Sequence, residues 1–147
     1  ACTQNIKWCP TPFYLWKWRD NSVCRRDPLY LKKTYPDLIK SSNHMLEWYT
    51  KKSKFDNARQ TVASIVLDCY YTFCHPSWKT IETQEYRDKA EKCFAEYFKK
   101  WEYLWNECPD QVKMQISSGI RQREVIQGME METETLEQFL TRMKSLV

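Results

Sequence analysis

The sequence predicts an all-α domain: an antiparallel bundle of four to five helices, stapled by disulfide bonds, behind an irregular N-terminal arm that contains cysteines. Apolar residues recur at spacings of three and four over most of residues 36–147, as in amphipathic helices. The 147 residues include only two glycines, Gly119 and Gly128, too few for the many tight turns of an all-β fold. Seven cysteines in so short a chain favour a disulfide framework.

Length and composition fit one folded domain that covers residues 1–147. Hydrophobic residues make up 42% of the chain and the net charge is only +4, which excludes a disordered charged tail. The scarcity of glycine also excludes a G-x-G-x-x-G fingerprint and a Walker loop, the usual cradles for nucleotide phosphates. We therefore expect no cofactor.

Residues 1–35 form the predicted arm. This segment holds three prolines, three cysteines and seven aromatic residues, with seven basic and two acidic side chains. It shows no sustained helical period apart from a short helix expected near residues 29–33.

The helical bundle is predicted to start at Pro36. A first helix runs to about Lys52 with an apolar stripe, and Ser53 and Asp56 resemble a capping box that starts a second helix. This second helix extends to about Cys74, where His75–Pro76 ends it. The predicted stripes comprise Leu38, Ile39, Met45, Leu46 and Tyr49 in the first helix, and Phe55, Ala58, Val62, Ile65, Val66, Cys69 and Phe73 in the second.

The strongest helical pattern covers residues 83–107, and two further helices follow it. Asp110 is expected to cap a helix over residues 111–127 that ends at Gly128. Thr135 and Gln138 then open a last helix. The long helix carries one apolar face, composed of Tyr86, Ala90, Cys93, Phe94, Tyr97, Phe98, Trp101, Leu104 and Trp105.

The cysteines indicate an oxidising compartment, and sequence alone allows 105 pairing schemes with one cysteine left over. Cys93 and Cys108 on one helix are about 22 Å apart, too far for a bridge. Antiparallel packing favours Cys69–Cys93 and Cys24–Cys108. A zinc site is disfavoured because no C-x2-C pair occurs and the two histidines lie far apart. The predicted disulfide residues are Cys2, Cys9, Cys24, Cys69, Cys74, Cys93 and Cys108.

We expect a secreted, extracellular protein. The chain starts at Ala1–Cys2 without an initiator methionine, as a mature chain does after removal of its signal peptide, and as a recombinant fragment also does. No stretch approaches the ~18 apolar residues of a membrane span. Membrane contact is expected only if the chain was cut from a single-pass precursor.

The candidate catalytic residues point away from an enzyme. Cys74 and His75 are adjacent, and sequence neighbours seldom face each other as a nucleophile pair must. The glutamates of the long helix alternate with lysines, and pairs such as Glu85–Lys89 and Glu96–Lys100 indicate a solvated face rather than a glycosidase site.

The candidate binding residues lie in the arm. Basic and aromatic residues alternate there, as in protein interfaces. The alternative is that the arm packs over the helices with its charges in solvent. Nucleic acid is a weaker interpretation because the net charge is modest, so none is expected as a partner. The predicted contact residues are Trp16, Lys17, Trp18, Arg19, Arg25 and Arg26.

Two functions remain open from the sequence. The first is a binding protein without chemistry of its own that engages another protein, as an effector, a ligand or the ectodomain of a cell-surface receptor. The second is a carrier, in which the aromatic face of the long helix and the later methionines enclose a small apolar ligand or lipid. Helical cytokines share the predicted architecture, but fold alone says little about function.

Overall fold

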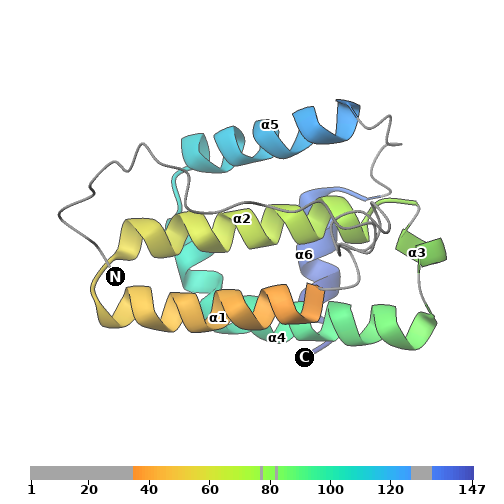
Figure 1. Cartoon of the computed structure of the whole chain (residues 1–147), viewed down its shortest axis with the longest axis horizontal. Coiled ribbons are helices and arrows are strands. Elements are labelled where there is room, and N and C mark those ends of the chain that lie inside the picture. Colours follow the sequence, from red (N-terminus) through yellow and green to blue (C-terminus); the bar gives the residue numbers. More distant parts are fainter. Residues whose placement is uncertain (1–34, 77, 82, 127–133) are drawn as a thin grey trace, which may run out of the picture.

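The computed structural model describes residues 35–76, 78–81, 83–126 and 134–147. This part of the chain is all-helical and contains no strand, so the predicted helical bundle is confirmed (Figure 1). The predicted arm, with its short helix near residues 29–33, and Gly128 lie outside the described residues. The helices are α1 (Tyr35–Lys51), α2 (Phe55–Phe73), α3 (Trp78–Ile81), α4 (Gln84–Glu107), α5 (Asp110–Ile126) and α6 (Leu136–Lys144).

Helix α2 is the centre of the arrangement. It packs against α1, α4 and α5, while α1 also contacts α4 and α6 packs on α4. In Figure 1, α1, α2 and α4 run nearly parallel to one another in space, α5 lies along α2 on the side away from α1, and α6 crosses the bundle steeply. Within the described part, none of the helices has the length and apolarity needed to cross a bilayer.

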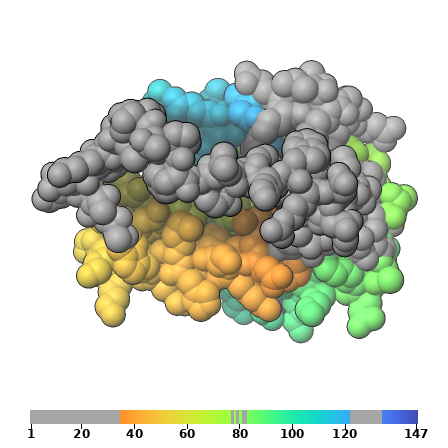
Figure 2. Space-filling model, in the orientation of Figure 1, coloured from red at the N-terminus to blue at the C-terminus, as the bar shows by residue number. Residues whose placement is uncertain are grey.

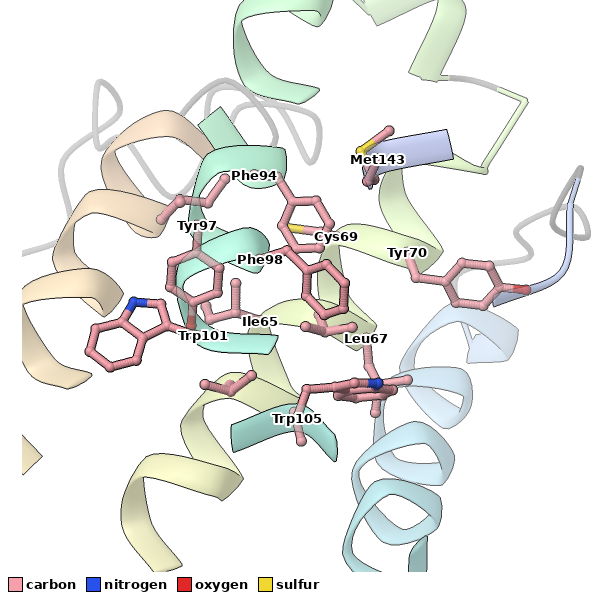
Figure 3. Close-up of a cluster of buried hydrophobic side chains, with 14 of the residues drawn as sticks. Ile65, Leu67, Cys69, Tyr70, Phe94, Tyr97, Phe98, Trp101, Trp105 and Met143 are labelled. Carbon is pink, nitrogen blue, oxygen red and sulfur yellow. The ribbon is translucent and has the colours of Figure 1, made fainter. Parts of the chain in front are cut away.

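The core lies where α2, α4 and α6 meet. Phe94 and Phe98 project from α4 toward Cys69 of α2, and Met143 of α6 lies beside them (Figure 3). These side chains are nearly or completely buried. Phe94 stacks on Phe98 with ring centroids 6.0 Å apart. Aromatic rings of this size bury large apolar areas, so this cluster contributes strongly to the stability of the core.

Side-chain caps mark the starts of α4 and α6, and the cap of α6 is the one that the sequence predicts. The Thr83 hydroxyl accepts a hydrogen bond from the Tyr86 amide (3.3 Å) at the start of α4. At the start of α6, Thr135 and Gln138 form the expected capping box, with reciprocal bonds of 3.2 and 2.9 Å. Each cap satisfies amides that the first helical turn leaves without partners.

The predicted capping box at Ser53 is wrong. Ser53 ends α1 in the left-handed conformation, with φ of 54°. Its amide donates to the Thr50 carbonyl (3.0 Å) and the Lys54 amide donates to the Tyr49 carbonyl (2.8 Å), the bond pattern of a Schellman motif. Lys54 then precedes α2 without a side-chain cap. Ser53 therefore belongs to the end of α1, where these two backbone bonds hold it, and not to the start of α2.

The expected disulfide staple is absent from the described part of the chain. Cys69, Cys93 and Cys108 are free thiols there, so the expected Cys69–Cys93 bridge is not formed. The Cys93 sulfur faces the Pro36 carbonyl instead, at 4.0 Å. Cys2, Cys9 and Cys24 lie outside the described residues, and so does the other end of the expected Cys24–Cys108 pair.

Candidate functional site

The predicted contact residues of the arm lie outside the described residues. The structure therefore says nothing about the positions of Trp16, Lys17, Trp18, Arg19, Arg25 and Arg26.

The aromatic face of α4 is core. Phe94, Tyr97 and Trp101 are buried, and the Tyr97 hydroxyl shares a hydrogen bond with Ser42 of α1 (2.9 Å). The Trp101 indole N–H donates to Asn43 at 2.8 Å. These bonds explain how bulky amphipathic rings can be buried between α1 and α4.

Charged side chains of α4 form ion pairs with residues of neighbouring helices rather than with each other along α4. Lys100 binds Glu47 of α1 at 2.6 Å, not the Glu96 that lies one turn before it. The Lys100 ammonium thereby lowers the pKa of the Glu47 carboxyl below its ordinary value. Glu102 pairs with Lys144 of α6 at 2.5 Å and Glu107 with Arg59 of α2 at 3.2 Å. The expected i,i+4 pairing is thus corrected to pairing across neighbouring helices.

Cys74 is held in a way that opposes catalysis. Its buried thiol donates a hydrogen bond to a Glu134 carboxylate oxygen at 3.3 Å. Burial and this acidic neighbour raise the pKa of Cys74 far above its ordinary value. A nucleophilic cysteine needs the opposite shift, because the thiolate is the reactive form. The described residues also contain no cluster of three or more His, Cys, Asp or Glu side chains suited to a metal ion.

Cys93 lines a surface hollow of about 270 Å³ between α1 and α4, together with Lys40, His44 and Glu96. Burial raises the pKa of this thiol as well, although Lys40 acts in the opposite direction. The hollow thus contains an unactivated thiol among exposed charges.

The strongest surface feature is the turn between α1 and α2. Trp48 and Phe55 are 38% and 42% exposed. The ring centroids of Trp48 and Tyr49 lie 5.4 Å apart in an edge-on arrangement, and the Lys54 ammonium lies 5.1 Å from the Trp48 ring centroid. Trp48, Tyr49, Lys54 and Phe55 are called the turn patch below.

The turn patch carries its aromatic rings on a rigid backbone. The Schellman bonds fix the backbone between the two helices, and the attraction of the Lys54 ammonium to the indole ring adds about 0.5–1 kcal/mol. Figure 2 shows the start of α2 (yellow) beside α1 (orange) at one end of this face. The sequence signal for this patch was weak. Trp48 falls outside the predicted apolar stripe, and Phe55 was assigned to the core by its spacing.

A groove runs from the turn patch along α1 and α2. Its volume is about 340 Å³, and Leu38 and Met45 of α1 face Thr61 and Ile65 of α2 across it. Leu38 and Met45 are 41% and 46% exposed, so the prediction that both contribute to the core is wrong. Helix α1 is apolar on two faces: Ile39 and Leu46 point into the bundle, and Leu38 and Met45 point out of it.

Comparison of the chain with protein-family models, with curated proteins and with solved structures gave no match.

Proposed function

We propose that this protein is a helical binding protein that engages another protein through the turn patch and performs no chemistry of its own. The observation that carries the proposal is the gathering of Trp48, Phe55 and Lys54 at one rigid turn. Tryptophan is among the residues most enriched at the energetic centres of interfaces. A rigid turn loses little conformational entropy when it binds.

The expected partner surface is apolar with an acidic edge. Two exposed rings need an apolar pocket, and Lys54 with its neighbours Lys51 and Lys52 gives this end of the bundle positive charge. The proposal places the protein outside the cell, with the partner a cell-surface receptor or another extracellular protein. Support for this location comes from the high cysteine content, seven in 147 residues.

The test is capture followed by a binding measurement with matched variants. The wild-type protein and the variants Trp48→Ala and Tyr103→Ala are used as bait on intact cells. Tyr103 is a suitable control because it is an exposed aromatic ring on α4, 47% exposed against 38% for Trp48. We expect one protein to be retained by wild type and Tyr103→Ala and lost by Trp48→Ala.

The purified partner is then titrated against all three proteins. A centre of binding energy costs at least 2 kcal/mol on truncation, so Trp48→Ala should weaken affinity roughly 30-fold. Equal affinities for the three proteins would show that the turn patch is not the interface. Thermal unfolding of each variant confirms that the exposed substitutions leave the fold intact.

A carrier of a small apolar ligand is the second candidate function, because one hollow in the structure has a suitable volume. Between α4 and α6 lies a space of about 470 Å³, lined by Phe98, Trp105, Leu136 and Leu140 and bordered by the Glu102–Lys144 ion pair. Its volume is within the range of small-molecule sites. Displacement of a fluorescent fatty acid, abolished by Leu140→Lys but not by Leu38→Lys, would establish this function. Failure of wild type to bind the probe would remove it.

A further inference from the structure

The α1–α2 groove is a built apolar surface without a described occupant. The ten side chains that line it include no charged group. Leu38 and Met45 are seven residues apart and thus lie on one stripe of α1. Two large apolar side chains left exposed in line along a groove indicate a surface that is covered in the functional molecule.

The start of α1 fixes where a chain segment could enter this groove. The Tyr35 hydroxyl donates to Asp68 of α2 at 2.9 Å and shares a hydrogen bond with Thr72 at 2.6 Å. Tyr35 is thereby pinned to α2 one turn before Leu38. Residue 34 therefore joins the described structure at the Leu38 end of the groove.

The length of the preceding chain is sufficient to cover the groove. The 17 residues of α1 extend for about 25 Å at 1.5 Å per residue. An extended chain needs about eight residues for that distance at ~3.3 Å per residue. Residues 1–34 exceed this length several times over.

The composition of residues 1–34 complements the groove. Six aromatic residues offer apolar rings, among them Trp16 and Trp18, and seven basic residues face only two acidic ones. The Leu38 end of the groove carries two carboxylates. Asp37 is exposed one turn before Ser41, and Asp68 is half-buried one turn after Ser64. Lys32 and Lys33 immediately precede this acidic end in sequence.

We propose that the chain's own N-terminal segment, residues 1–34, packs along the α1–α2 groove and covers Leu38 and Met45 with its aromatic side chains. The occupant is intramolecular because the segment is tethered at the groove's end, which gives it an effective concentration in the millimolar range. The inference goes beyond the proposed function, and its tests use the chain alone, so they do not depend on the proposed partner.

The test uses the full chain with a photoreactive benzoylphenylalanine in place of Met45. We expect an intramolecular cross-link, mapped by mass spectrometry, between this position and residues 1–34. The same amino acid in place of Met114, which is exposed on α5, is the control and should not label the segment with comparable yield. Cross-links to a second copy of the chain, or none to residues 1–34, would overturn the proposal.

A second measurement follows hydrogen exchange of the segment. Leu38→Lys and Met45→Lys change exposed positions, so α2 and α4 should keep their wild-type protection. Amides within residues 1–34 should exchange roughly tenfold faster in these variants, corresponding to about 1.4 kcal/mol of lost docking. Met114→Lys should leave their exchange unchanged. Identical exchange of the segment in wild type and in the groove variants would contradict the proposal.

Discussion

Helices α5 and α6 are both added to the α1–α2–α4 layer, yet they are held in opposite ways. Helix α5 has 17 residues and α6 only nine. Among the described side chains of α5, Ile120 alone is buried, and Met114 is 69% exposed. The shorter α6 buries Phe139 and Met143 completely.

Polar contacts enlarge this difference. Arg142 of α6 binds Glu91 of α4 at 2.7 Å, and its guanidinium also binds Glu134 through two nitrogens, at 2.5 and 3.0 Å. Glu91 in turn accepts a hydrogen bond from the buried Trp78 indole at 3.1 Å. The contacts of α5 are simpler, such as Arg121 donating to the Tyr71 hydroxyl at 3.2 Å. We therefore expect buried anchors and fork-shaped charge pairing, more than helix length, to decide how firmly each of the two helices is docked.

The largest effect should come from Phe139→Ala. The centroid of the Phe139 ring lies 5.4 Å from that of Phe94 and 5.6 Å from that of Tyr70. Its removal leaves a cavity among rings that cannot collapse, at a cost of about 3–5 kcal/mol. Urea unfolding measures this loss, and hydrogen exchange should show α6 opening first. A loss below 1 kcal/mol would mean that the aromatic anchor does not hold α6.

Arg142→Gln should cost less, about 1–3 kcal/mol. The ion pairs are only partly buried, with 36% of the Arg142 side chain exposed, so the cost lies between those of surface and buried pairs. Arg142→Lys is the matched control because it keeps the charge and loses the fork. If both variants match wild type in urea unfolding, the network contributes nothing to docking.

Ile120→Ala should cost about 1–2 kcal/mol, less than an equally buried core position. Helix α5 packs against α2 on one side, so it opens locally before the rest unfolds and thereby limits the global loss. Hydrogen exchange should show faster exchange in α5 with unchanged protection in α4. Equal loss of protection in both helices would make α5 part of the cooperative core and erase the contrast.

Raising the pH to 10 should lower the free energy of unfolding by about 1 kcal/mol, through the buried Cys74 thiol next to Glu134. Burial and Glu134 raise the pKa of Cys74 above the ordinary 9.0 of a thiol, and Cys74 is almost fully buried. A group whose folded pKa is raised stabilises the fold fully below its unfolded pKa and loses that contribution as pH rises above it. The melting temperature should therefore fall above pH 9.

The matched variant for this pH effect is Cys74→Ala. Its melting temperature should fall less steeply between pH 8 and 10 than that of wild type. Burial also raises the pKa values of other groups, which maintain part of the decline: Cys69, Cys93, Cys108, Tyr35 and Tyr97. Identical pH profiles would assign the decline to those groups alone.

The sequence by itself determined the helical class and most helix positions. The Thr135–Gln138 pair marks the start of α6 because caps act through bonds within one turn. The spacing of apolar residues identified the core face of α4 correctly, because every aromatic ring of that helix that is more than nine-tenths buried lies on the predicted face. Helix α3 (Trp78–Ile81) is a single turn, which is too short to show a periodic spacing of apolar residues in the sequence.

Tertiary structure decided what depends on neighbours distant in sequence. Leu38 and Ile39 are adjacent and apolar, yet only Ile39 is buried, because burial depends on which side α2 and α4 approach. For the same reason, Lys100 forms an ion pair with Glu47 of α1 and not with Glu96. The turn patch and the α1–α2 groove likewise exist only once two helices are packed, because periodicity identifies an apolar face but does not specify which part of it another element covers.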